Sequence, residues 1–234
     1  MSEFQRTAIV TGGARGIGRA ISEKLAMDGL CVCVADKDKE AADLAAARIK
    51  ATGMVYSLQV DVSSRSSIER MFAEASSQMG NIDVLICNAG INNGFGNLFD
   101  SDHSHTSMLN VLNVNVLGCV LTIKYLKKNL NSNAKIVLIS STLGIQQHIG
   151  SNATIYRASK AAVNNIMVSV SEELKSENIT VVSFHPGWVR TDMGGANATL
   201  SAKDSAKELI KSFENLSFKD TGKFFNYDGA IINF

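Results

Sequence analysis

The sequence contains almost no proline, because Pro186 is the only one among 234 residues. Proline interrupts helices and central strands, so its scarcity favours a chain built from regular elements. Cysteine is also sparse, and four thiols are too few for a disulfide scaffold at this length. All four lie in apolar runs, so we expect buried, reduced thiols and a cytoplasmic location. They are Cys31, Cys33, Cys87 and Cys119.

Strong charge and long apolar runs are absent as well. The formal net charge is +1, which gives no bulk electrostatic attraction to nucleic acid or to an anionic membrane. The first ten residues, MSEFQRTAIV, lack the basic start and apolar core of a signal peptide. No uninterrupted apolar run reaches the ~18 residues that a membrane span requires. Without linkers, repeats or low-complexity tracts, residues 1–234 are expected to form a single globular domain with no nucleic-acid or membrane partner.

A glycine-rich turn near the N-terminus is the first positive signal. An apolar run ends at Thr11-Gly12, and Gly16-Ile17-Gly18 opens a helical pattern. This T-G-x-x-x-G-x-G spacing is a variant of the dinucleotide-binding fingerprint. Glycine lets the backbone approach a ligand closely, and free N–H groups at a helix start can bind a pyrophosphate. The alternative interpretation is an ordinary strand-to-helix turn.

Apolar segments and helical patterns alternate along the whole chain. We expect strands at 8–10, 30–35, 55–60, 84–87, 135–140, 180–185 and 224–226. We expect helices at 16–26, 37–52, 64–79, 106–129 (with a break allowed), 155–176 and 201–215. Continuous apolar strands joined by helices predict repeated βαβ units. The expected fold is α/β, a Rossmann-type doubly wound parallel sheet of about seven strands with helices on both faces.

Small or polar residues follow the first six of these strands. In such sheets, ligands bind beyond the carboxyl ends of the strands. The pattern therefore predicts an NAD(P)-binding domain, with its substrate site at the ends of the fourth to sixth strands. The residues are the glycine turn, Asp36, Asp61, Asn88-Ala89-Gly90, Ser140-Ser141 and His185-Pro186-Gly187.

Asp36 lies 20 residues beyond Gly16 (36 − 16 = 20). A carboxylate at about this distance hydrogen-bonds the adenosine ribose hydroxyls and repels a 2′-phosphate, which favours NAD. Arg15 and Lys37 are the opposing signal, since either could pair with a phosphate, and NADP remains the alternative cofactor. Asp36 could also cap a helix that begins at Lys37.

Tyr156 and Lys160 are four residues apart on an expected helix, so they share one face. An ammonium about 4 Å from the phenol contributes roughly 4 kcal/mol at an effective dielectric near 20. That energy could lower the pKa of Tyr156 by up to ~3 units, towards 7, where a general acid–base group works best. The alternative is a surface pair on a solvated helix.

Together these residues resemble the short-chain dehydrogenases/reductases, over nearly the whole chain. The resemblance implies that Tyr156 exchanges a proton with the substrate oxygen and that Lys160 lowers its pKa and binds the nicotinamide ribose. It also implies that Ser141 polarises a carbonyl and that Asn115 orders a water relay. The cofactor-binding set that it implies, with the glycine turn, is Gly12, Arg15, Gly16, Ile17, Gly18, Asp36, Asp61, Val62, Asn88, Ala89, Gly90, Tyr156, Lys160, Pro186, Gly187, Val189 and Thr191.

Two features depart from the commonest family pattern. Ser141 and Tyr156 are 15 residues apart (156 − 141 = 15), so Ser140 is the alternative if the alignment shifts. The C-terminal half, with HPGWVRTDMGG from His185 and FNYDG from Phe225, is similar to the C-factor and sniffer branch of carbonyl reductases. That branch generally prefers NADPH, against the indication from Asp36.

The resemblance implies an oxidoreductase that transfers a hydride between nicotinamide and a carbonyl or secondary alcohol. It also implies a homodimer or homotetramer formed through the helices at 106–129 and 155–176. A short segment after Thr191 suggests an open pocket for a bulky carbonyl, bordered by 92–99, 145–153 and 193–196. The alternatives are a nucleotide-sensing binding protein and an epimerase or dehydratase that retains its cofactor. His103 and His105 are interpreted as solvated loop residues, His185 as structural, and no metal site is expected.

Overall fold

The computed structural model describes residues 5–49, 54–93, 96–99 and 103–234, and these form a single eight-stranded sheet. The strand order is β3-β2-β1-β4-β5-β6-β7-β8, and every pair is parallel except β7 with β8. The strands are β1 (Thr7–Thr11), β2 (Cys31–Asp36), β3 (Val55–Gln59), β4 (Ile82–Cys87), β5 (Leu130–Ile139), β6 (Thr180–His185), β7 (Phe224–Asn226) and β8 (Ile231–Ile232). The doubly wound prediction is confirmed, with β8 added to the seven expected strands.

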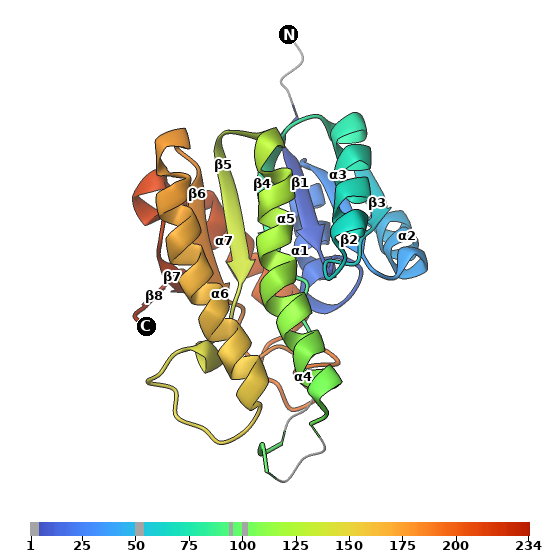
Figure 1. Cartoon of the computed structure of the whole chain (residues 1–234). Coiled ribbons are helices and arrows are strands. Elements are labelled where there is room, and N and C mark those ends of the chain that lie inside the picture. Colours follow the sequence, from blue (N-terminus) through green and yellow to red (C-terminus); the bar gives the residue numbers. More distant parts are fainter. Residues whose placement is uncertain (1–4, 50–53, 94–95, 100–102) are drawn as a thin grey trace.

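Helices cover both faces of this sheet (Figure 1). One core contains side chains from α1 (Gly16–Met27), α2 (Lys39–Arg48) and α7 (Ala202–Asn215). The other contains side chains from α3 (Arg65–Met79), α5 (Gly118–Leu126) and α6 (Thr154–Glu173). Burial of the central strands on both faces explains why they are continuously apolar instead of alternating.

The helix expected at 106–129 is continuous but changes its winding. It consists of α4 (His105–Leu112), a π-helical turn (Asn113–Leu117), α5 and a final 3₁₀ turn (Lys127–Asn129). π turns occur mostly as single turns inside α-helices, often at functional sites. Here the π turn contains Asn115, whose side chain is buried.

Two other boundaries differ from the sequence prediction. Helix α2 begins at Lys39, because Asp38 caps it by accepting a hydrogen bond from the Ala41 N–H. Asp36 is therefore not the cap. The expected end of this helix, at 52, lies outside the described residues, and α2 ends at Arg48. All four cysteines are buried and free, as expected.

By length and composition alone, the helix His105–Asn129 could cross a membrane, with a mean hydropathy of 1.5. One such helix is weak evidence, because core helices pass the same test. This helix contributes Cys119, Ile123 and Leu126 to the core on its face of the sheet.

Candidate active site

The glycine turn between β1 and α1 has the geometry of an anion cradle. Gly12 and Gly16 have φ of 62° and 51°, a left-handed conformation that favours glycine. A Cβ on Gly18 would lie 2.1 Å from the Gly12 carbonyl oxygen, so the helix start packs directly on the turn. The side chain of Arg15, the N-cap residue of α1, accepts no hydrogen bond from the first turn of the helix. By contrast, the N-cap side chain of α2, Asp38, accepts one from the Ala41 N–H. The first N–H groups of α1 therefore suit an anionic ligand.

Asn88, after β4, holds this turn in place. Its Nδ2 donates to the carbonyl oxygens of Thr11 and Gly12, both at 3.0 Å. The N–H groups of Asn88 and Ala89 donate to Thr11 Oγ1 at 3.1 and 3.2 Å. The Asn88 amide nitrogen thus supports the cradle from the neighbouring strand.

The end of β2 forms a network of charges beside the turn. Asp36 Oδ2 accepts a hydrogen bond from the Ala14 N–H at 3.1 Å. Lys37 pairs with Asp61 at 2.9 Å. Val62, which follows Asp61, is buried under the long helix, where a Cβ on Gly118 would lie 2.8 Å from Val62 Cγ2.

The segment after β6 lies next to the glycine turn. A Cβ on Gly16 would lie 3.1 Å from Thr191 Cγ2, so this segment approaches the glycine turn. Pro186 is anchored through its carbonyl oxygen, which accepts from Ser205 Oγ at 2.7 Å. Gly187 has a φ of 83°, and Val189 is buried.

Tyr156 and Lys160 face inward from the first turns of α6. The side chain of Ser141, just beyond the end of β5, interacts with the Tyr156 hydroxyl and favours its ionised form, which lowers its pKa. Lys160 is buried, and its Nζ donates to the Ile139 carbonyl oxygen at 2.8 Å. This Nζ lies 5.6 Å from the centre of the Tyr156 ring. The alternative of a solvated surface pair is therefore wrong.

The expected acidification of Tyr156 is also wrong in this structure. Burial raises the pKa of Tyr156 to about 12, although the neighbouring Ser141 side chain acts in the opposite direction. Burial likewise lowers the pKa of Lys160 to about 8. Desolvation disfavours both charged forms, and the amine is directed at a backbone carbonyl instead of the phenol.

The two candidate serines have different partners. Ser141 lies next to the Tyr156 hydroxyl and influences its pKa, and Ser141 Oγ accepts from the Leu143 N–H at 3.1 Å. Ser140 Oγ instead donates to the Lys160 carbonyl oxygen at 3.3 Å. The geometry therefore favours Ser141 over Ser140 as the partner of the tyrosine.

Asn115 connects three elements around this centre. Its Oδ1 accepts from the Ile91 N–H at 2.8 Å, and its Nδ2 donates to the Ile91 carbonyl oxygen at 2.9 Å. The same Nδ2 donates to Ser159 Oγ at 3.0 Å, and Ser159 Oγ donates to the Tyr156 carbonyl oxygen at 2.7 Å. A Cβ on Gly90 would lie 3.4 Å from Asn115 Oδ1 and 3.5 Å from Lys160 Nζ, so both polar groups face this glycine.

Two residues that position this centre were not predicted from the sequence. Ser159 links the π turn to the first turn of α6, and its place before Lys160 in a Y-x-x-S-K pattern was the available signal. Gly144 allows the segment after β5 to touch α6, since a Cβ there would lie 2.6 Å from the Lys160 carbonyl carbon. No local pattern distinguishes that glycine from an ordinary loop residue.

Two cavities border the start of α6, and only the smaller one reaches Tyr156. The smaller cavity, about 10 Å³, has room for roughly one water molecule. It is lined by Asn92, Asn93, His103, Ser107, Met108, Val111, Ala153, Ile155 and Tyr156. The larger cavity, about 370 Å³, is lined by Asn97, Leu98, Phe99, Ser151 and Thr154. His103 is thus half-buried beside the tyrosine and is not simply a solvated loop residue. In the described part of the chain, no His, Cys, Asp and Glu cluster could hold a metal ion.

His185 gives the stability a pH dependence that can be measured. Burial, with a smaller contribution from His148, lowers the pKa of His185 to about 4. An unfolded histidine titrates near 6.5, so the unfolded chain binds more protons between pH 4 and 6.5. The free energy of unfolding should therefore rise with pH across this window, by roughly 3 kcal/mol. Denaturant unfolding of His185→Gln should show a flatter rise, while His105→Gln, at the exposed start of α4, should keep it. An unchanged slope in His185→Gln would contradict the assignment.

Comparison with known proteins gives a consistent result. A family model described as short chain dehydrogenase matches residues 6–201. C-signal of Myxococcus xanthus is 35% identical over 156 residues, which are 65% of this chain and 93% of that protein. An NADPH-bound carbonyl reductase from chicken fatty liver has a TM-score of 0.88 and 27% identity, over 98% of this chain and 99% of that one. Carbonyl reductase Sniffer of D. melanogaster has a TM-score of 0.88 and 26% identity, over 98% and 100%. These similarities confirm both resemblances found in the sequence.

Proposed function

Because the chain belongs to the short-chain dehydrogenase family and is an oxidoreductase of C=O and CH–OH groups, we propose that it reduces a carbonyl substrate with Tyr156 as the proton donor. The observation that carries this proposal is the convergence of Tyr156, Ser141 and Lys160, with the Lys160 amine facing Gly90 just beyond β4. We place the substrate site at the carboxyl ends of β4, β5 and β6, within one NAD(P)-binding domain over residues 1–234.

The residues present fit a nicotinamide dinucleotide. The left-handed glycines and the uncapped start of α1 suit its pyrophosphate, and Asp36 suits an adenosine ribose. Asp61 and Val62 would border the adenine, and Val189 and Thr191 the carboxamide. When bound, the nicotinamide supplies or accepts the hydride.

The protonated state of Tyr156 suits the reductive direction. A phenol with a pKa of about 12 keeps its proton throughout the physiological range and can donate it to an oxygen that gains negative charge. Ser141 would hold that oxygen by a hydrogen bond. Lys160, with its pKa of about 8, retains a proton close to neutral pH. It would return a proton to Tyr156 after the reduction. The Lys160 amine and the Asn115 side chain both face Gly90, so we expect this proton to pass beside that glycine.

For the cofactor, we propose a preference for NAD over NADP. Asp36 adds negative charge where a 2′-phosphate would lie. Both nearby cations, Arg15 and Lys37, are already paired with carboxylates. The NADPH bound to the chicken-liver reductase is the opposing indication, so the preference is expected to be moderate.

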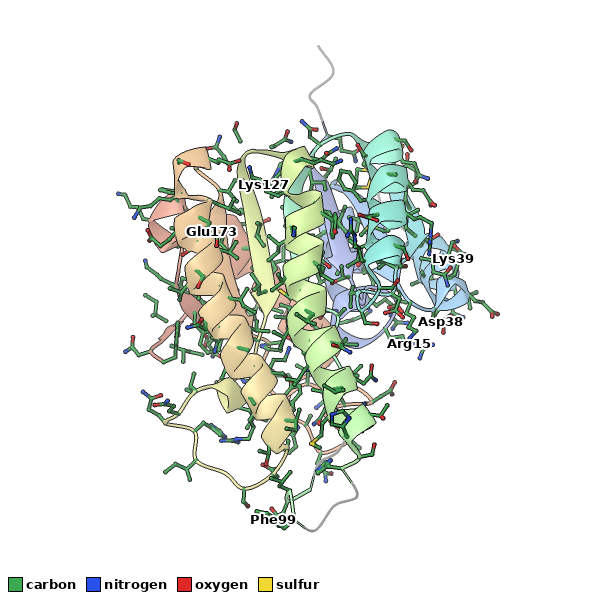
Figure 2. All side chains as sticks on the ribbon, viewed as in Figure 1. Arg15, Asp38, Lys39, Phe99, Lys127 and Glu173 are labelled. Carbon is green, nitrogen blue, oxygen red and sulfur yellow. The ribbon has the colours of Figure 1, made fainter. Side chains whose placement is uncertain are left out.

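A two-cofactor activity panel tests this function. Carbonyl substrates of increasing apolar bulk should be reduced with NADH, and with NADPH at lower catalytic efficiency. We expect a preference for bulky substrates because the larger cavity, at the start of α6, includes Leu98 and Phe99, and Phe99 is exposed (Figure 2). Tight nucleotide binding without turnover would favour a nucleotide sensor. Nucleotide that copurifies with the protein and shows no net reduction would favour an epimerase or dehydratase.

We also propose a cytoplasmic homodimer or homotetramer assembled through α4, α5 and α6. Three large apolar side chains in this region are exposed, which suits burial against a second copy. They are Leu109 on α4, Leu117 in the π turn and Val168 on α6. Sedimentation velocity of the purified chain should show no monomer at micromolar concentration.

A further inference from the structure

We propose that Asp38 sets the cofactor preference by holding Arg15, the cation that would otherwise bind a 2′-phosphate. This inference rests on the proposed nicotinamide-dependent function. Arg15 lies in the glycine turn, and Asp38 is the N-cap of α2, two residues beyond Asp36 at the end of β2. We call this region, with Lys37 and Asp61, the ribose corner. Figure 2 shows the two labelled side chains close together at the ends of their elements.

Asp38 is held in one orientation by its own contacts. Its Oδ1 accepts from the Ala41 N–H at 3.0 Å, which caps α2. Its own N–H donates to Asp36 Oδ1 at 3.2 Å. Its Oδ2 forms an ion pair with Arg15 Nη2. Since Asp36 Oδ2 also accepts from the Ala14 N–H, hydrogen bonds close a ring through the turn, β2 and α2.

In this ring, Asp38 takes the place that a phosphate would occupy on Arg15. Guanidinium groups bind carboxylates and phosphates by the same charge-assisted hydrogen bonds. The other cation of the corner, Lys37, is paired with Asp61. Two cations thus face three carboxylates, including Asp36, and the corner has an excess of negative charge. A nucleotide without a 2′-phosphate does not compete with Asp38 for Arg15 and is not repelled by these carboxylates.

The preference produced in this way should be graded and not absolute. The side chains of Arg15 and Asp38 are 65% and 44% exposed. Exposed ion pairs contribute little to stability, so Arg15 can leave Asp38 when a stronger anion arrives. Removing the Asp38 charge should therefore raise the affinity for a nucleotide with a 2′-phosphate by about tenfold relative to one without it. This is the size of effect expected from a single nearby charge.

The test compares Asp38→Asn with the unaltered protein. Asparagine is an N-cap of similar quality, so α2 should remain folded, and thermal unfolding checks this. Calorimetry would measure adenosine 5′-diphosphate and adenosine 2′,5′-bisphosphate, neither of which needs nicotinamide or Tyr156. We expect Asp38→Asn to bind the bisphosphate about tenfold more tightly and the diphosphate within about twofold. The ratio of catalytic efficiencies with NADPH and NADH should rise in parallel.

Two further variants make the result specific. Asp28→Asn removes the same charge from an exposed ion pair with Lys24 at the far end of α1, and should change neither affinity. Arg15→Gln combined with Asp38→Asn should lose most of the gain, because the gain requires Arg15. Both ligands binding with an unchanged ratio in Asp38→Asn would overturn this inference and leave the proposed function intact. Failure of every variant and of the unaltered protein to bind either ligand would instead refute the nucleotide site.

Discussion

Replacing Tyr156 by phenylalanine is expected to lower the rate of carbonyl reduction by about 10³-fold, within the range measured for loss of a general acid. The substitution removes one oxygen and the proton it carries, but leaves the ring that packs at the start of α6. Nucleotide affinity should stay within about threefold, because the cradle of Gly12, Gly16 and Gly18 does not depend on the hydroxyl. Stopped-flow reduction and fluorescence titration of bound NADH would measure the two effects separately.

Tyr125→Phe is the matched control for this prediction. Tyr125 is a partly buried tyrosine on α5 that packs under Arg65, with 5.6 Å from the guanidinium carbon to the ring centre. It loses the same atom at a position remote from Ser141, and should retain full activity. Retention of more than a tenth of the activity in Tyr156→Phe, with that control unchanged, would remove the tyrosine from the proton-transfer step.

The position of this tyrosine follows from local sequence, whereas its titration does not. A four-residue spacing on a helix places Tyr156 and Lys160 on one face regardless of the rest of the chain. The sign of each pKa shift depends on what surrounds that face. Burial dominates for both groups, and the Ile139 carbonyl oxygen receives the amine. Contacts between segments distant in sequence decide this, so the spacing alone gave the wrong direction.

The same distinction applies to the elements of the fold. Continuous apolar runs that end in small or polar residues predicted the parallel strands, since both faces of a central strand are buried. The π turn at Asn113–Leu117 has no such local signature. It turns Asn115 towards Ile91 and Ser159, which are 24 and 44 residues away in the chain. Strand β8 has only two residues and pairs with β7, too short a segment for periodicity to show.

Replacing Gly18 by alanine should have the largest effect outside the catalytic centre. The new Cβ would lie 2.1 Å from the Gly12 carbonyl oxygen and 2.5 Å from Asn88 Nδ2. Both are parts of the cradle, and the first is backbone, so the helix start must move away from the turn. We expect nucleotide affinity to fall about 100-fold, as for the loss of two charge-assisted hydrogen bonds, and the free energy of unfolding to fall by about 3 kcal/mol.

Gly29→Ala separates this local effect from the general cost of replacing a glycine. Gly29 lies just beyond the other end of α1, has a φ of 88°, and a Cβ there would meet no atom within 4 Å. Backbone strain should lower its free energy of unfolding by about 1 kcal/mol and leave nucleotide affinity unchanged. Calorimetric titration and denaturant unfolding of both variants would measure the difference. Of the two glycines, only Gly18 contacts the turn between β1 and α1. Nearly equal nucleotide affinities in the two variants would therefore mean that this turn does not bind the phosphates.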